Sequence, residues 1–430
     1  MFKDKYLFHL IILISFFSDP YIWIMAVTKD NRLINIALIL ISFLFILKKK
    51  MILGSRDYIW LGSWVAVFLF INVHGTVLAD VTQVVQSYGY LSKMCFLLVV
   101  IYALKKDFPQ LLKLFFQYNI VIMYASVVLF FLLLFGIELP SIEFTQGTSG
   151  MGLDRNWLYP LGVVMDKNYV GDAIFNRICG LTDEPGQLAL LITWMLVLNE
   201  FTLKSKSYRN HLIFCGIFTF SFAFLISIAL FGIYFLIVKI NRPKLIVRNI
   251  TLMAILMGLI YSLLGDVPKS YINSKIFERI ADITSDESSG IVGDNKTGSI
   301  VRHYNELKSH DRFWFGFGVT ESRELALDNQ DFSTYGMISL FTRYLPFYLL
   351  LLLHIKNIRV LLLLIIVVNF VQRPGIHFVA QMMCLTFIYY SSILNRYAGM
   401  LPNKKTNICN GDLLPEDASN FCGENEIGRS

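Results

Sequence analysis

Long apolar stretches with almost no charges constrain this chain more than any other feature of its sequence. A helix that crosses the ~30 Å hydrocarbon core of a bilayer needs about 20 such residues. Ten stretches are candidates for spans of this kind. They are Tyr6–Val27, Asn31–Leu47, Asp57–His74, Val84–Leu104, Leu114–Gly136, Gly186–Thr202, Ile246–Gly265, Gly336–Ile355, Ile358–Val371 and Ile376–Leu394.

One further apolar run, His211–Ile240, is too long for a single upright span. As one helix it would measure roughly 45 Å at 1.5 Å per residue. A single span would also leave Lys239, Arg242 and the basic residues after them outside the cell. Two short spans that turn near Phe220–Ala223 keep these charges in the cytoplasm. The sequence therefore predicts about twelve spans, with both termini cytoplasmic.

Composition and charge support this interpretation. Hydrophobic residues make up 55% of the chain and charged residues 16%, against about 25% charged in soluble domains. The predicted inner loops and termini hold 15 Lys and 6 Arg, whereas the short outer loops hold only Lys29, Arg32 and Arg373. Basic residues favour the cytoplasmic side of a membrane protein. The net charge of +7 is thus explained by topology, and no nucleic-acid partner is expected.

The predicted fold is an all-α polytopic integral membrane protein with two large extracytoplasmic loops. The sequence divides at the ends of the apolar stretches. The segments are five spans in 1–136, a first loop in 137–185, four spans in 186–265, a second loop in 266–335, three spans in 336–394 and a polar cytoplasmic tail in 395–430.

The first large loop ends in a run that enters the next span directly, from Arg177 through Gly180 to Glu184-Pro185-Gly186. Proline suits the first turn of a helix, and Asp183 is a candidate N-cap. The free N–H groups of such a helix start would face the outer surface and favour an anion. Arg177 is the candidate anion-binding side chain here, and an ordinary capped helix with a solvated arginine is the alternative.

The second large loop carries more arginines. Arginine is favoured where a planar fork must contact two phosphate or carboxylate oxygens. Arg279, Arg302 and Arg312 are candidates of this kind, and His303 follows Arg302 directly. A helix through 299–309 would instead pair Arg302 with Glu306 as ordinary surface neighbours. Residues 271–283 have isoleucines at helical spacing, which predicts a helix packed on the membrane face.

Other candidate residues lie in or beside the spans. Lys93 falls in mid-span and Arg343 about two turns into the tenth span, and a charge at such a depth needs a partner or water. Arg373 stands at the outer end of the last span. Trp157 and Trp314 are candidates for stacking on sugar rings, although interfacial aromatic belts are the commoner use of such residues.

Several kinds of chemistry lack their sequence signatures. The chain has no Walker-type phosphate loop, no H-E-x-x-H and no D-x-D motif. Its six Cys show no metal-binding spacing. We therefore expect no cofactor and no metal site.

The loop motifs resemble those of bacterial O-antigen and capsular polysaccharide polymerases of the Wzy type. The similar features are Arg177-x-x-Gly180 with Glu184-Pro185-Gly186, then Ser299-x-x-Arg302 followed by Phe315-Gly316-Phe317-Gly318, and finally Gly336-Met-Ile-Ser. The similarity extends from about Glu138 to Leu394, and the plan of many spans with two large outer loops is its strongest part. O-antigen ligases share the plan but usually carry a His late in the second loop, where Asp328–Tyr335 has none.

The resemblance implies a metal-independent glycosyltransferase that polymerises undecaprenyl-diphosphate-linked repeat units. It implies the bilayer and the lipid-linked glycan as partners, with a chain-length regulator and a flippase of the same pathway. Arg177 and Arg302 would bind the diphosphate, with Arg279 and Arg312 as weaker candidates, and Glu184 and His303 are candidate bases. A ligase, or a flippase or transporter of lipid-linked glycan, is the alternative; a transporter would use Lys93 and Arg343 within the spans.

Overall fold

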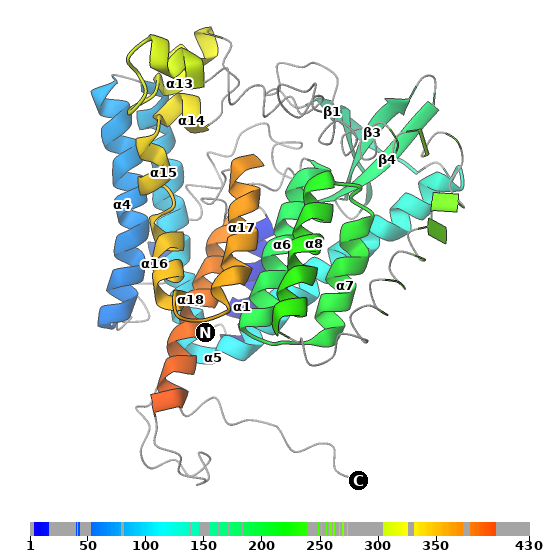
Figure 1. Cartoon of the computed structure of the whole chain (residues 1–430), viewed down its shortest axis with the longest axis horizontal. Helices are drawn as coiled ribbons and strands as arrows, with labels where there is room; N and C mark the ends of the chain where they lie inside the picture. Colours follow the sequence, from blue (N-terminus) through cyan, green and yellow to red (C-terminus); the bar gives the residue numbers. More distant parts are fainter. Residues whose placement is uncertain are drawn as a thin grey trace.

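The computed structural model describes residues 4–16, 53–78, 81–137, 139–145, 155–160, 163–170, 173–182, 184–238, 304–325, 331–372 and 379–400, with a few isolated positions in 40–43 and 248–273. These parts are mostly helical and form a bundle with a small sheet at one end (Figure 1). The helices are α1 (Asp4–Phe16), α4 (Ser55–Val77), α5 (Val81–Leu134), α6 (Pro185–Phe201), α7 (Lys206–Ile217), α8 (Phe222–Val238), α13 (Gly318–Glu324), α14 (Asp331–Tyr335), α15 (Ile338–Thr342), α16 (Leu345–His354), α17 (Val360–Gln372) and α18 (Val379–Met400).

Two of the described helices are long and apolar enough to cross a membrane, namely the stretches Ser55–Gly75 of α4 and Gly89–Leu134 of α5. Shorter apolar helices accompany them in α1, α8, α16 and α18. The second predicted span, the amphipathic stretch 271–283 and the tail lie almost entirely outside the described residues.

Helix α5 is bent at the position where the sequence predicts a turn between two spans. Asp107 has non-helical angles (φ −158°, ψ 84°), and Pro109 follows it. The Asp107 carboxylate accepts a hydrogen bond of 3.0 Å from the backbone N–H of Gln110, which is the geometry of an N-cap. Proline is tolerated in a first helical turn because its missing N–H has no intrahelical partner there. Asp107 therefore ends one helical segment and begins the next.

The predicted turn within His211–Ile240 is also present. Helix α7 ends at Ile217 and α8 begins at Phe222. Between them, Phe220 has a positive φ of 46°. The Thr219 hydroxyl donates to the Gly216 carbonyl at 2.7 Å, which satisfies a carbonyl at the end of α7. The run is thus two helices that divide close to the predicted position, and their assignment as two spans stays a prediction.

The tenth predicted span, Gly336–Ile355, is not one continuous helix. Helix α15 ends at Thr342, and α16 begins at Leu345 with Pro346 in its first turn. A proline within a helix lacks the N–H for the i−4 bond and clashes with that carbonyl, so the helix is interrupted before it. This interruption places Arg343 at the joint between the two helices.

The longer helices alternate in direction along the bundle (Figure 1). Contacts near one end join the start of α4 to the bend of α5 (Asp57–Lys105) and to the later part of α18 (Asp57–Tyr390). At the same end, the Ser391 hydroxyl donates to the Phe201 carbonyl of α6 at 3.1 Å. The second half of α5 and α7 run parallel, because Phe116 stacks on Tyr208 and Phe130 packs against Phe218.

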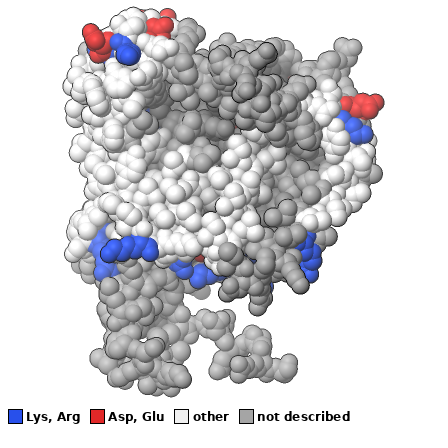
Figure 2. All heavy atoms as spheres, in the orientation of Figure 1, with Lys and Arg blue, Asp and Glu red and all other residues white. Residues whose placement is uncertain are grey.

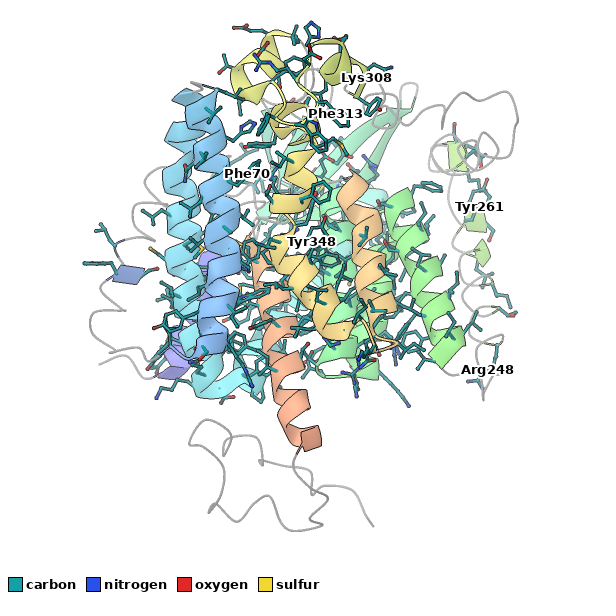
Figure 3. All side chains as sticks on the ribbon, turned by 60° about the vertical axis from the view of Figure 1, so that its left-hand side comes forward. Phe70, Arg248, Tyr261, Lys308, Phe313 and Tyr348 are labelled. Carbon is teal, nitrogen blue, oxygen red and sulfur yellow. The ribbon has the colours of Figure 1, made fainter. Side chains whose placement is uncertain are left out.

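Basic residues gather at this end of the bundle, which we call the basic end. Figure 2 shows Lys and Arg along the lower edge, below a broad band of described surface on which no Lys, Arg, Asp or Glu is visible. The described basic residues that the helix ends place there are Arg56, Lys105, Lys106, Lys204, Lys206, Arg209, Lys356 and Arg359. In Figure 3, Arg248 lies at the level of the basic end and Tyr261 lies nearer the opposite end.

The opposite end, which we call the sheet end, carries a four-stranded antiparallel sheet. Its strands are β1 (Ile142–Thr145), β2 (Arg155–Leu158), β3 (Val164–Val170) and β4 (Ala173–Gly180), in sequence order. This sheet lies within the first predicted loop, so the prediction of an all-α fold is wrong for that loop. Strands of four to eight residues with mixed polar and apolar positions give a weak periodic signal, and the long apolar helices dominate the pattern.

Candidate functional site

The sheet end holds the described residues that the sequence nominates for a polymerase; Lys93, nominated for a transporter, lies within α5. The nominated residues that fall here are Trp157, Arg177, Glu184, Arg312, Trp314 and Arg343. Arg279, Arg302, His303 and Arg373 lie outside the described residues, so their roles stay predictions.

The strand register separates polar and apolar side chains of β3 and β4 onto the two faces of the sheet. Asp166 pairs with Arg177 across β3 and β4, while Met165 pairs with Ile178 on the other face. Met165 and Ile178 are fully buried in the main hydrophobic cluster, so their face covers the helices. Side chains alternate between faces along a strand. Asp166 and Arg177 therefore project from the face that points away from the helices.

Arg177 is held by an ion pair. Its Nε donates to Asp166 Oδ2 at 2.8 Å, and its Nη2 contacts the same oxygen. The Asp166 side chain is only 5% exposed and that of Arg177 21% exposed. Arg177 thus contacts a carboxylate of its own loop, and this carboxylate fixes the direction of the guanidinium. A phosphate could contact Arg177 only through the part of its guanidinium that does not face Asp166.

Trp157 lies on the face of the sheet that covers the helices. The Lys167 Nζ is 3.4 Å from the centroid of the Trp157 ring, a close cation–π contact. The Trp157 indole N–H is buried and finds no hydrogen-bond acceptor within the described part of the chain. One ring face is therefore covered by a cation, which leaves less of the ring for stacking on a sugar than the sequence analysis assumed.

Glu184 stands at the start of α6, directly after the sheet. It occupies the N-cap position in extended conformation, with Pro185 in the first turn. The predicted cap, Asp183, is therefore wrong by one residue, and the Glu184 side chain makes no capping hydrogen bond. The helix start does face the sheet end, as expected. Pro185 has no N–H, and the Gln187 and Leu188 N–H groups both donate to the Glu184 carbonyl, at 3.0 and 3.2 Å. The expected set of free N–H groups for an anion is therefore largely absent from this helix start.

The two glycine motifs of the second loop meet in space. The Phe317 N–H donates to the Ser333 carbonyl at 2.9 Å, and the Met337 N–H donates to the Phe313 carbonyl at 2.9 Å. Gly316 and Gly336 have positive φ values of 70° and 67°. A Cβ on Gly316 would lie 2.6 Å from the Gly336 nitrogen, so only glycine permits this crossing.

A stack of three polar side chains lies beside this glycine crossing. The Arg343 guanidinium carbon is 4.6 Å from the Tyr335 ring centroid, and the His74 ring packs on Tyr335 at 5.1 Å. The His74 Nε2 contacts the Phe315 carbonyl. Arg343 is 2% and His74 3% exposed. A buried cation is costly unless the surroundings stabilise it. The Tyr335 ring provides part of that stabilisation for Arg343.

Arg312 and Trp314 differ from Arg343 in being exposed. Trp314 is 57% exposed and Phe315 53%, and Arg312 is exposed at the turn before them. Exposed aromatics beside a helix bundle are available to a membrane interface or to a bound molecule.

Tyr159, near the sheet, is buried; burial raises the pKa of its hydroxyl, while a hydrogen bond with Ser141 acts in the opposite direction. It is a neutral hydroxyl at physiological pH.

His74 and Gln381 are two buried polar residues that were not predicted as candidates from the sequence. His74 closes an apolar span and gave no motif. Gln381 is the one amide in the first two turns of α18 and is 1% exposed. Neither its Oε1 nor its Nε2 has a hydrogen-bond partner among the described residues. A polar residue early in a predicted span was the available signal for Gln381.

Known proteins give no independent indication of what this site does. Comparisons with protein-family models, with curated proteins and with solved structures find no match to this chain. Among the described residues, no group of three or more His, Cys, Asp or Glu side chains could hold a metal ion. What the described site offers is a set of arginines, one carboxylate at a helix start and several aromatic rings at one end of an apolar bundle.

Proposed function

We propose that the chain is an integral membrane protein whose basic end faces the cytoplasm and whose sheet end faces outward. Two helices of membrane-crossing length support this placement. The alternating direction of the helices and the cluster of basic residues at one end support the orientation, because short cytoplasmic loops are enriched in Lys and Arg. About twelve spans follow if the parts outside the described residues continue the pattern.

We further propose that the protein polymerises lipid-diphosphate-linked oligosaccharide repeat units into a surface polysaccharide at its outer face. One observation carries this proposal. The two segments whose motifs resemble those of the polymerases, Phe315–Gly318 and Gly336–Ser339, cross at the sheet end next to the buried Arg343. The motifs are separated in sequence, so a shared site explains why both occur.

The reaction joins a sugar hydroxyl of one unit to the anomeric carbon of another. The bond from that carbon to the diphosphate oxygen breaks, and the hydroxyl proton passes to a base. Negative charge grows on the leaving oxygen, and preorganised arginines stabilise it. We assign Arg343 and Arg302 to this oxygen, with Arg177 in support because Asp166 engages part of its guanidinium. Glu184 and His303 are the candidate bases.

A flippase or transporter of lipid-linked glycan is the second candidate. It is favoured by the burial of charge within the helices: Lys93 is 8% exposed, with its Nζ 5.4 Å from the Tyr90 ring centroid, and Arg343 is 2% exposed. A ligase, by contrast, gains no support from the described residues. The polymerase proposal is preferred because it also accounts for the two glycine motifs at the sheet end.

Deletion of the protein from its host distinguishes the three possibilities. Loss of a polymerase leaves surface glycan of a single repeat unit without a ladder of longer chains. Loss of a flippase leaves the lipid-linked unit inside, with no repeat unit displayed, and loss of a ligase leaves long polymer on the lipid carrier. Gel analysis of the surface glycan, with extraction of the lipid-linked pool, separates these outcomes. An intact ladder in the deletion strain would refute the polymerase proposal.

A further inference from the structure

The helix-facing side of the sheet carries polar side chains as well as the buried Met165 and Ile178. Trp157 shares this side because it pairs with Met165 across β2 and β3. Asn176 shares it because it stands two positions before Ile178 in β4, and Lys167 shares it because it pairs with Asn176. Side chains two positions apart in a strand point to the same face, and so do those of cross-strand partners. Trp157, Lys167 and Asn176 therefore lie on one face, on three successive strands.

Two contacts join these three residues into one group. The Lys167 Nζ lies 3.4 Å from the centroid of the Trp157 ring. Lys167 and Asn176 are direct partners in the register of β3 and β4, which brings their Cβ atoms to about 4.5–5.5 Å from each other. Lys167 thus stands between the indole on one side and the amide on the other. We call Trp157, Lys167 and Asn176 the sheet cluster.

Two atoms of the sheet cluster are buried without a hydrogen-bond partner in the part of the chain that the structure describes. They are the Trp157 Nε1, whose N–H can only donate, and the Asn176 side-chain Oδ1, which can only accept. Buried polar groups in native proteins are nearly always satisfied by protein, water or a ligand. A donor and an acceptor that both lack partners on one sheet face indicate a bound molecule that offers both functions.

The sheet cluster lies between the closed hydrophobic core and an exposed edge of the sheet. The sheet packs on α5 and α6 through β4 (Figure 1). The three residues of the cluster are each half-buried. Glu143, the cross-strand partner of Trp157 in β1, is exposed and lies on the same face. A molecule that enters from the β1 edge therefore meets Glu143 first and then the half-buried side chains of the cluster.

The chemistry of this face selects an uncharged ligand that is rich in hydroxyl groups. An oxyanion would meet the Glu143 carboxylate and the lone pairs of the Asn176 oxygen, and a cation would meet the Lys167 ammonium. A hydroxyl group can accept from the Trp157 indole N–H and also donate to an amide oxygen. A single water molecule has the same abilities. A sugar ring differs from water because its several hydroxyl groups can contact the indole, the amide and the charged side chains together.

We infer that the sheet cluster binds a sugar of the oligosaccharide through its hydroxyl groups, with the N–H edge of Trp157 as the contact and not its ring face. The inference rests on the proposed function for the source of the sugar, and it deepens that function by assigning a glycan contact to the first loop. Arg177 projects from the opposite face of the sheet. The cluster therefore binds the glycan without the help of this arginine, and binding does not require the diphosphate.

Binding of the free repeat-unit oligosaccharide tests this site without turnover. The probe is the oligosaccharide released by mild acid from the lipid-linked pool of the host, which carries neither lipid nor diphosphate. It is titrated into the purified full-length protein in lipid nanodiscs, with calorimetry and saturation-transfer NMR as readouts. We expect the oligosaccharide to bind and inorganic diphosphate not to displace it. Absence of binding, as for a cluster that holds only water, would overturn the inference, and so would complete displacement by inorganic diphosphate.

Two variants test the residues themselves. Trp157→Phe keeps an aromatic ring beside Lys167 but removes the N–H, and Asn176→Leu keeps the branched shape of the side chain but removes the amide. Each is expected to weaken oligosaccharide binding about tenfold, because one hydrogen bond to the sugar is lost. The ligand-free melting temperature of Asn176→Leu should be equal to or higher than that of the parent protein, since a buried acceptor without a partner is removed. Its lower affinity is then not a consequence of unfolding.

Matched controls make the same exchanges elsewhere. Trp60→Phe in α4 removes an indole N–H that donates to the Thr386 hydroxyl at 3.1 Å, and Asn305→Leu replaces an exposed amide. Both should bind the oligosaccharide like the parent protein, and Trp60→Phe should melt at a lower temperature. Parent-like affinity in both cluster variants would refute the site and leave the polymerase proposal untouched. Binding that depends on the cluster, in a protein whose deletion leaves the glycan ladder intact, would instead refute the proposed function and retain the site.

Discussion

At the scale of single residues, two described arginines of the sheet end lie in unlike environments. Arg177 is paired with Asp166 on an outward face of the sheet, whereas Arg343 is buried against Tyr335 at a helix joint. The first arrangement orients a guanidinium that remains 21% exposed, and the second holds a charge among aromatic and apolar side chains. The sequence motif around Arg177 did not reveal its partner, because the pairing depends on the register of β3 and β4.

Replacing Arg177 by lysine tests whether its planar fork is used by a substrate. Lysine keeps the charge and can still approach Asp166, so the protein should reach normal levels in the membrane. It cannot reproduce two-point contact with a phosphate, so we expect Arg177→Lys to lose most of the long polymer on a surface-glycan gel. A parent-like ladder would leave Arg177 as a structural partner of Asp166 only.

Gly316 should tolerate no side chain. A Cβ there meets backbone atoms of Gly336 and Thr334 at 2.6 Å, and a φ of 70° disfavours other residues. We expect Gly316→Ala to lower the free energy of unfolding by about 2–3 kcal/mol, from backbone strain and overpacking. The control is Gly62→Ala in α4, where nothing lies within 4 Å of the new methyl. Thermal melting in detergent should show the loss for Gly316 alone, and equal melting of both variants would contradict the crossing.

At the scale of elements, the sequence predicted helices well and the sheet not at all. Helices α4, α6 and α17 agree with the predicted spans to within a few residues, because helices of that length have a strong apolar signal. The bend at Asp107 and the turn before Phe222 followed from charge and length. The four short strands did not, and neither did the joint before Leu345, although Pro346 was its signal.

The α7–α8 turn depends on a close approach of two residues. A Cβ on Gly216 would overlap the Phe224 ring, which is 2% exposed. We expect Gly216→Ala to cost about 1–3 kcal/mol by overpacking. The double variant Gly216→Ala/Phe224→Leu should recover part of that loss, since the smaller side chain leaves room for the methyl. Additive losses in a double-mutant cycle of melting data would show that the two residues do not share this contact.

At the scale of the whole molecule, the charge distribution and the helix directions define one axis, with the basic end and the sheet end at opposite sides. Single cysteines in a cysteine-free variant, at Ser207 near the basic end and at Ser309 near the sheet end, report which end is outside; both residues are exposed. An impermeant thiol reagent applied to intact cells should label Ser309→Cys and not Ser207→Cys. Labelling of Ser207→Cys without permeabilisation would reverse the orientation and remove the polymerase site from the outer face.

Reconstitution tests the central claim most directly. Purified protein in liposomes is supplied with lipid-diphosphate-linked repeat units extracted from the host, without nucleotide and with a metal chelator present. The account predicts glycan longer than one unit on the lipid carrier, with one undecaprenyl diphosphate released for each linkage formed. Units that cross the bilayer and remain single, with no lipid diphosphate released, would contradict it.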